Sequence, residues 1–83
     1  MYEVEFTNRA VKNFKKIDSK YQSLIIEKLE FLANDPMRST NVKALKGSQY
    51  YRLRVAHYRI IYELQNNDLI ILVIDINHRK DIY

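Results

Sequence analysis

The sequence predicts a single α+β domain spanning residues 1–83, in which a helical hairpin packs on one face of an antiparallel sheet. Two observations predict this class. Apolar residues recur at helical spacing in most of the first half of the chain and alternate at strand spacing in the second half. With 83 residues the chain can form only one small core, so both helices are needed to cover the sheet. The expected element order is β-α-α-β-β-β.

The first strand and helix are predicted within residues 2–17. Residues 2–6 alternate apolar and polar side chains, which is typical of a strand with one buried face. Thr7 or Asn8 can then cap a short helix, because both side chains accept hydrogen bonds from the backbone of a first turn. The apolar residues expected on one side of this helix are Ala10, Val11, Phe14 and Ile17.

A second helix is predicted after an interruption at Asp18. Ser19 and Gln22 have the spacing of a capping box. Pro36 ends the helix, because proline disfavours a helical conformation of the residue before it. The expected inner face of this helix consists of Ile25, Leu29 and Leu32.

The rest of the chain is strand-like after a polar connection, residues 37–49, that contains the only glycine, Gly47. Residues 66–68 predict a hairpin turn, and Ala56–His57 predict a tighter turn that lacks glycine. Three segments rich in β-branched and aromatic residues are expected to form an antiparallel meander: 50–55, 58–64 and 69–77.

Alternation assigns each strand residue to one face of the sheet. Leu53 and Val55 are expected to point toward the helices, so Arg52 and Arg54 point away from them. The helix-facing residues of the other two strands are expected to be Tyr58, Ile60, Tyr62, Leu64, Ile70, Leu72, Ile74 and Ile76. The uncovered face then also holds Arg59, Asp75 and Arg79. Asp75 is expected to pair with one of these two arginines.

The positive charge of the chain is confined to its second half. Residues 1–36 contain six basic and six acidic residues, whereas residues 37–83 contain eight basic and four acidic ones, so the whole net charge of +4 lies there. Five of those eight are arginine, whose planar guanidinium matches phosphate better than the point charge of lysine. Like charges on neighbouring strands repel each other. An anionic ligand therefore explains the cluster better than a solvated face.

Composition excludes several kinds of site. Without cysteine the chain forms no disulfide, thiolate metal site or cysteine nucleophile, and its two histidines are not clustered with acids as metal ligands. No cofactor is expected. The longest apolar run, 69–74, has six residues, against about 20 for a membrane span. Residues 1–3 show no secretory signal, so we expect a cytoplasmic protein with no membrane partner.

Several stretches resemble the RelE/ParE superfamily of bacterial type II toxins, and the RelE branch in particular. YRLRV at 51–55 and YRIIYE at 58–63 are similar to strands of the superfamily, and KALKG precedes them at 43–47. The ending HRKDIY at 78–83 is similar to RelE rather than to ParE. The resemblance covers nearly the whole chain and implies the element order predicted above.

This resemblance implies a ribosome-dependent endoribonuclease, an mRNA interferase that inhibits translation. Members of the RelE branch cleave mRNA in the ribosomal A site by attack of a ribose 2′-hydroxyl on the adjacent phosphate, without a metal. The implied partners are the ribosome, mRNA and a co-expressed antitoxin, whose acidic segment is expected to dock here in a toxin–antitoxin hetero-oligomer. The family's basic residues and C-terminal aromatic match Arg52, Arg54, Arg59, Arg79 and Tyr83.

The chemistry suggests a role for each of these side chains. Arginine donors stabilise charge on a phosphoryl group under attack, so Arg59 and Arg79 are the expected catalytic clamp. Tyr83 can stack on a base as a further catalytic-site residue. The residues expected to bind the RNA backbone are Arg52, Arg54, His78 and Lys80.

The general base is left open by the sequence. RelE-type enzymes often carry lysine where this chain has Arg52 and Arg54, and arginine is a poor proton acceptor. Lys46, on the loop before the arginine strand, is the expected catalytic alternative. Lys80 and His78 are the others, although alternation turns His78 toward the helices.

Two other functions remain as alternatives. One is a ParE-like inhibitor of DNA gyrase without ribonuclease activity. The other is a degenerate, non-catalytic toxin homologue, since the lysines of RelE are replaced at Arg52 and Arg54.

Overall fold

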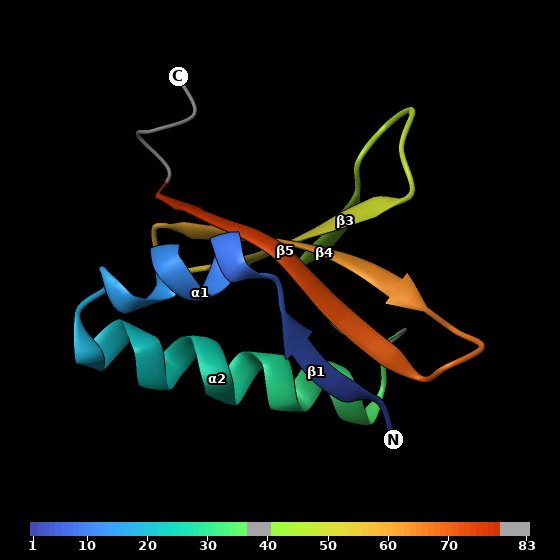
Figure 1. Ribbon diagram of the computed structural model, residues 1–83, viewed down its shortest axis with the longest axis horizontal. Coiled ribbons are helices and arrows are strands. Elements are labelled where there is room, and N and C mark those ends of the chain that lie inside the picture. The colour runs from blue at the N-terminus through green and yellow to red at the C-terminus, as the bar shows by residue number, and fades with distance from the viewer. Residues whose placement is uncertain (37–40, 79–83) are drawn as a thin grey trace.

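The computed structural model describes residues 1–36 and 41–78. Two helices pack on a five-stranded sheet, which confirms the predicted α+β class and the helical hairpin (Figure 1). The elements in chain order are β1 (Glu3–Phe6), α1 (Asn8–Lys15), α2 (Ser19–Asn34), β2 (Val42–Ala44), β3 (Tyr50–Val55), β4 (Tyr58–Gln65) and β5 (Ile70–His78).

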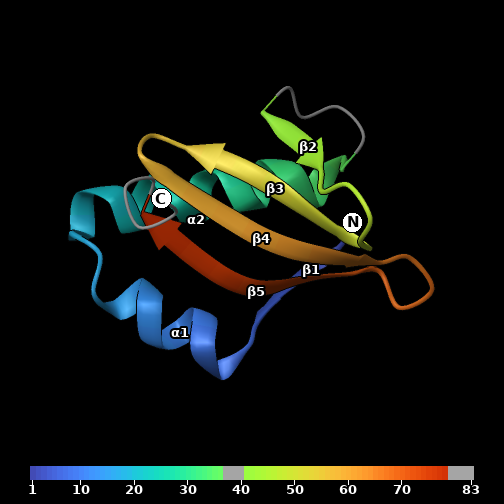
Figure 2. The same ribbon diagram turned by 90° about the horizontal axis from the view of Figure 1, so that it is seen from above.

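The sheet has the strand order β1-β5-β4-β3-β2. Strands β3, β4 and β5 form the predicted antiparallel meander. However, β1 pairs with β5 in parallel, so the sheet is mixed rather than wholly antiparallel. In Figure 2, α2 lies behind the sheet and α1 lies beyond β5, so the sheet face toward the viewer carries no helix. We call this face the open face.

A short strand, β2, lies inside the segment predicted to be a polar connection. It pairs antiparallel with β3, with Val42 opposite Leu53 and Lys43 opposite Arg52. Three residues are too few for alternation to be recognised. The pairing of β2 therefore depends on β3 rather than on a pattern of its own, and it adds a lysine to the open face.

An irregularity in β5 changes which of its side chains face the helices. Ile61 pairs with Asp75 but the next residue of β4, Tyr62, pairs with Val73, so Ile74 is an extra residue on β5. Such a bulge reverses the alternation on one side of it. The predicted inner positions 70, 72 and 74 are therefore wrong, and the buried residues of β5 are Ile71, Val73 and Ile76.

The helices cover the core largely as predicted. The expected inner face of α2 is confirmed, since Ile25, Leu29 and Leu32 are buried in the core together with residues of the strands. On α1, Ala10 is buried, but Val11 is 37% exposed and does not belong to the core. Neither helix in residues 1–36 and 41–78 has the length and apolar character needed to cross a membrane.

The two helix starts differ from each other in their capping. Thr7 caps α1 as predicted, because its Oγ1 accepts a hydrogen bond from the Ala10 N–H at 3.2 Å. The capping box predicted at Ser19 is wrong: Asp18 is the N-cap residue and makes no side-chain cap bond. Gln22 instead donates from Nε2 to the Phe14 carbonyl at 2.9 Å. It thus ties α2 to α1 across the hairpin, a contact between helices that local spacing does not encode.

Alkaline unfolding provides a test of the core. Tyr62 is 1% exposed and its ring stacks on Tyr51 with centroids 5.5 Å apart. Burial, with a smaller effect of Tyr51, raises the pKa of Tyr62 to about 12. In the unfolded chain the phenol ionises near pH 10. The contribution of Tyr62 to stability is therefore fully present below pH 10 and is lost as the pH rises through about 12.

We expect this loss to reach about 2–3 kcal/mol over that interval. The measurement is urea unfolding of the wild type and of Tyr62→Phe between pH 8 and about 11. The variant should lose less stability than the wild type as the pH rises. Parallel curves for the two proteins would show that the Tyr62 phenol is not responsible.

Candidate functional site

The open face carries a cluster of four basic side chains, which we call the basic surface: Lys43, Arg52, Arg54 and Arg59. Cross-strand pairing brings them together, because Lys43 stands opposite Arg52 and Arg54 stands directly opposite Arg59. Paired residues on neighbouring strands have Cβ atoms about 4.5–5.5 Å apart. The tight Ala56–His57 turn holds the second pair in register, with Ala56 at a φ of 53°.

Two guanidinium groups of the basic surface each hold a buried donor without a partner among the described residues. Nε of Arg52 and Nε of Arg59 are both buried and have no hydrogen-bond partner in the described part of the chain. Burial lowers the pKa of Arg52 below its usual range, and the charges of Arg54 and Arg59 lower it further. A buried, unsatisfied donor costs free energy. An anion bound here would supply both the missing acceptors and the missing negative charge.

Asp75 does not neutralise this surface. Its carboxylate lies 3.5 Å from Nε of Arg9 on α1, and it accepts a 2.7 Å hydrogen bond from Nδ2 of Asn13. Both of these partners belong to α1, which lies beside β5. The predicted pairing of Asp75 with Arg59 is therefore wrong, and its partner comes from a helix instead.

The structure brings some of the predicted site residues together and separates others. Arg52, Arg54 and Arg59 share the basic surface, whereas Lys46 is exposed in the turn between β2 and β3, at the opposite end of β3 from Arg54. His78 faces the helices, as alternation indicated, with its ring 5.1 Å from that of Tyr58. The other predicted site residues, Arg79, Lys80 and Tyr83, lie outside the described residues.

Lys43 is a candidate site residue that the sequence does not reveal. It lines a hollow of about 300 Å³ on the basic surface together with Asn41, Val42, Arg52 and Arg54. The hollow lies along β2 and β3, so it exists only because β2 adds to the sheet edge. The motif KALKG at 43–47 contains two lysines, but only the pairing of β2 with β3 places one of them, Lys43, beside the arginines.

Residues 4–83 match the family described as the ParE toxin of type II toxin–antitoxin systems, parDE. The match includes β1 from its second residue onward, both helices and strands β2 to β5. The chain belongs to this toxin family. Its basic surface and its helical hairpin are therefore features of a type II toxin of the RelE/ParE superfamily.

Relatives of this toxin include proteins named for RelE. It is 28% identical over 85 residues to an Escherichia coli protein named as a RelE-like toxin, an alignment that covers 99% of this chain and 90% of the relative. It is 24% identical to the mRNA interferase toxin RelE of Escherichia coli K12, covering 95% and 84%. The RelB–RelE antitoxin–toxin complex from Methanococcus jannaschii contains a chain that superposes with a TM-score of 0.78 and 29% identity, covering 95% and 94%.

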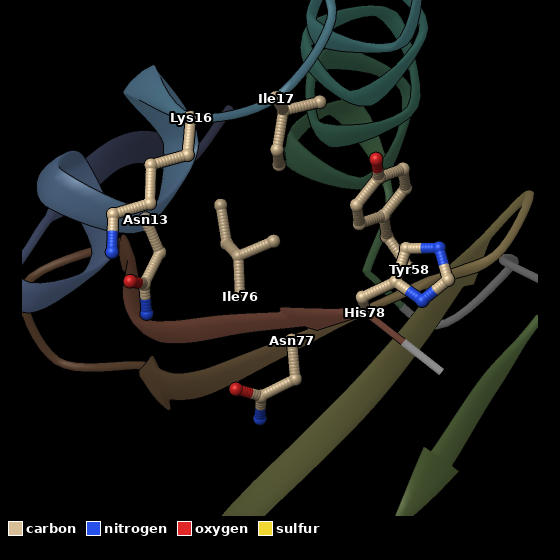
Figure 3. A pocket seen from close by; sticks show the side chains of 7 residues that line it. All are labelled: Asn13, Lys16, Ile17, Tyr58, Ile76, Asn77 and His78. Atoms are coloured by element: carbon tan, nitrogen blue, oxygen red, sulfur yellow. The ribbon is translucent and has the colours of Figure 1, made fainter. Parts of the chain in front are cut away.

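Another hollow of the toxin is a pocket of about 390 Å³ where the end of α1 faces the end of β5 (Figure 3). Ile17 and Ile76 point toward each other in its middle, with Asn13 and Lys16 on one side and Tyr58 and His78 on the other. Asn77 completes the lining from the opposite side of the strand.

Repulsion within the basic surface should be measurable as a loss of stability. Arg54 is exposed and stands directly opposite Arg59, and like charges in such pairs are destabilising by about 0.2–1 kcal/mol. We expect Arg54→Gln to raise the free energy of unfolding by about this amount in low salt. The gain should disappear in about 1 M salt, where the Debye length is about 3 Å.

Lys28→Gln is the matched control, because Lys28 is exposed in the middle of α2 and its removal changes the net charge equally. Urea unfolding of both variants at low and high salt makes the comparison. Equal gains in the two variants would assign the effect to net charge rather than to the arginine pair.

Proposed function

We propose that this toxin is a ribosome-dependent endoribonuclease that cleaves mRNA in the A site and so inhibits translation. The observation that carries the proposal is the pair of buried Nε atoms of Arg52 and Arg59, which have no partner in the described residues. Donors fixed in this way and lacking acid neighbours are suited to phosphoryl oxygens. The relative named mRNA interferase toxin RelE supports the same activity.

The reaction proposed is an in-line displacement at phosphorus that needs no metal. The ribose 2′-oxygen forms a bond to the adjacent phosphorus as the bond from phosphorus to the 5′-oxygen breaks. The 2′-hydroxyl proton passes to a base, and the 5′-oxygen takes up a proton, so the products end in a 2′,3′-cyclic phosphate and a 5′-hydroxyl. Negative charge grows on the phosphoryl oxygens during this step, and fixed arginines stabilise it.

Arg59 is the proposed clamp for that charge, because it sits in the central strand β4 and its backbone is held on both sides by β3 and β5. Arg52 and Arg54 bind the RNA backbone alongside it. Arg79 belongs to the same clamp and Tyr83 stacks on a base, with His78 and Lys80 as RNA contacts. These four roles follow from the resemblance to RelE.

Lys43 joins Lys46 and Lys80 as a candidate for the general base. It stands opposite Arg52 and so lies beside the arginines of the basic surface. Lys46 is separated from the arginines by most of β3. The geometry therefore supports Lys43 over Lys46.

The proposed partner is an antitoxin that covers the basic surface. The Methanococcus jannaschii relative is in a complex with the antitoxin RelB. On this chain, an acidic segment that orders on binding would satisfy the arginine donors and block access of RNA to them. The ribosome and mRNA are the proposed targets of the free toxin.

A translating extract tests the proposed activity. The measurement is primer extension on an mRNA with and without the toxin, and with and without ribosomes. We expect new 5′ ends inside codons that appear only when ribosomes are present. Intact mRNA in an extract whose protein synthesis still stops would contradict the proposal.

Inhibition of DNA gyrase is a second candidate function, because the family that matches residues 4–83 is described as the ParE toxin. A gyrase inhibitor would stop supercoiling by purified gyrase and would leave mRNA intact in the extract. Running both assays on one preparation separates the two functions.

A further inference from the structure

The helical hairpin carries a groove on the side of the molecule away from the basic surface. A hollow of about 420 Å³ between α1 and α2 is lined by Phe14, Gln22, Ser23, Ile26, Glu27 and Glu30. All of these except Phe14 belong to α2, where spacings of three and four residues align them in one stripe. In Figure 2, α2 lies behind the sheet, whereas the open face with the basic surface is toward the viewer.

Apolar side chains are exposed around this groove. Ile26 lines it and is 38% exposed, while Val11 and Phe31 are 37% and 59% exposed. Val11 lies three residues before Phe14, on the same side of α1, and Phe31 follows Glu27 by one turn of α2. They are the large apolar residues that the two helices expose to solvent. An exposed apolar patch with a polar rim is typical of an interaction surface.

The two walls of the groove carry opposite charges. The sequence of α1 contains three basic residues and no acidic one. On α2, the charged residues that line the groove are Glu27 and Glu30. These glutamates and the α1 lysines, Lys12 and Lys15, are exposed, and no ion pair engages them in the described part of the chain. The groove therefore offers a partner one positive and one negative wall.

A partner that fits this groove must also present a positive wall beside a negative one, around an apolar centre. The same groove in a second copy of the chain has this arrangement. A two-fold axis along the groove sets α1 of each copy against α2 of the other, so lysines face glutamates twice. Such self-complementary patches form the commonest class of oligomer, the two-fold dimer. RNA and acidic protein segments suit the groove less well, because Glu27 and Glu30 repel them.

We infer that the toxin associates with a second copy of itself through the α1–α2 groove. Reciprocal lysine–glutamate pairs surround apolar contacts made by Val11 and Ile26. The dimer leaves both basic surfaces exposed, because they lie on the opposite side of the sheet from α2. A small contact with a charged rim is a weak one, so the expected Kd is about 10–100 µM.

Sedimentation equilibrium of the full chain tests this inference. In low salt, the weight-average mass should rise with protein concentration from 10.0 kDa toward twice that value. High salt should weaken the association, because it screens exposed charges.

Two double variants test the charged walls. Glu27→Lys with Glu30→Lys makes both walls positive, and Lys12→Glu with Lys15→Glu makes both walls negative. Each variant alone should self-associate at least about tenfold more weakly than the wild type. Mixed together, the two variants should form a heterodimer, because the walls of one then match the walls of the other. This recovery also shows that both variants are folded.

The matched control is Glu3→Lys with Glu5→Lys. It changes the net charge as much as the variant with two positive walls does, but at exposed positions of β1 that do not line the groove. This control should associate with the affinity of the wild type.

Three results would overturn the inference. The first is a wild-type mass that stays at 10.0 kDa at every concentration. The second is the failure of the mixed variants to form a heterodimer. The third is an equal loss of association in the β1 control, which would assign the effect to net charge. If the wild type is monomeric and the groove variants lose only antitoxin binding, the groove belongs to the antitoxin instead. None of these measurements needs RNA or ribosomes, so their outcome is independent of the proposed ribonuclease function.

Discussion

Arg59→Ala is expected to reduce ribosome-dependent cleavage of mRNA by about 10²–10³-fold, the usual effect of removing one donor to a developing oxyanion. The physical reason is the position of the side chain. Arg59 lies in the central strand of the meander, opposite Arg54 on one side and Asn77 on the other. Its Nε is buried and has no acceptor in the described residues, so it is available to an acceptor on a bound ligand.

The fold should survive this substitution. Arg59 has no ion pair within the described residues to lose, and its removal relieves repulsion with Arg54. The expected thermal unfolding midpoint is therefore equal to or above that of the wild type. Arg59→Lys should recover only part of the activity, because lysine keeps the charge but not the planar fork of donors.

Arg9→Ala is the control for loss of an arginine. Arg9 pairs with Asp75 beside α1 and is not part of the basic surface, and an exposed pair of this kind contributes about 0–1 kcal/mol. Primer extension with the three proteins makes the comparison. If Arg59→Ala cleaves as fast as the wild type, the basic surface is not the catalytic site.

Ile25→Ala is expected to destabilise the fold more than any surface change discussed above. Ile25 is 0% exposed and lies on the α2 face that packs against the sheet. Truncating a buried isoleucine to alanine costs about 2–5 kcal/mol, because the apolar contacts are lost and a cavity remains. A small domain has a total stability of only about 5–15 kcal/mol. The unfolding midpoint should therefore fall by about 10–30 °C.

The next residue of the same helix supplies the matched control. Ile26 is 38% exposed, so Ile26→Ala removes the same atoms from a site that is partly in water already. Its expected cost is below about 1 kcal/mol. Thermal and urea unfolding of both variants make the measurement. Similar losses at the two positions would mean that α2 does not face the sheet as described.

The outward position of the arginines could be predicted from the sequence alone. Alternation in the strands gave the inward positions of Leu53 and Ile60 and therefore the outward positions of Arg52, Arg54 and Arg59. This inference was sound because β3 and β4 have no bulge, so a period of two applies along their whole length.

The same reasoning failed in β5. One additional residue at Ile74 shifts the register, so Ile71 and Val73 rather than 70, 72 and 74 point to the helices. All these positions are apolar or β-branched, so a periodicity of hydrophobicity could not distinguish the two faces. Asp75 lies beyond the bulge and binds Asn13 and Arg9 of α1 rather than Arg59.

The sequence by itself determined the α+β class, the element order apart from β2, the resemblance to type II toxins and the arginine-rich face. Each of these depends on local periodicity, on composition or on short motifs, which are readable along the chain. The roles of the site residues remain predictions.

Only the tertiary structure decided the parallel pairing of β1 with β5, the addition of β2 with Lys43, and the pocket beside Asn77. These features arise where distant segments meet, as when Thr7 binds the carbonyl of Ile74, 67 residues away. Contacts of this kind are selected by the packing of the whole domain. No local pattern of side chains records them.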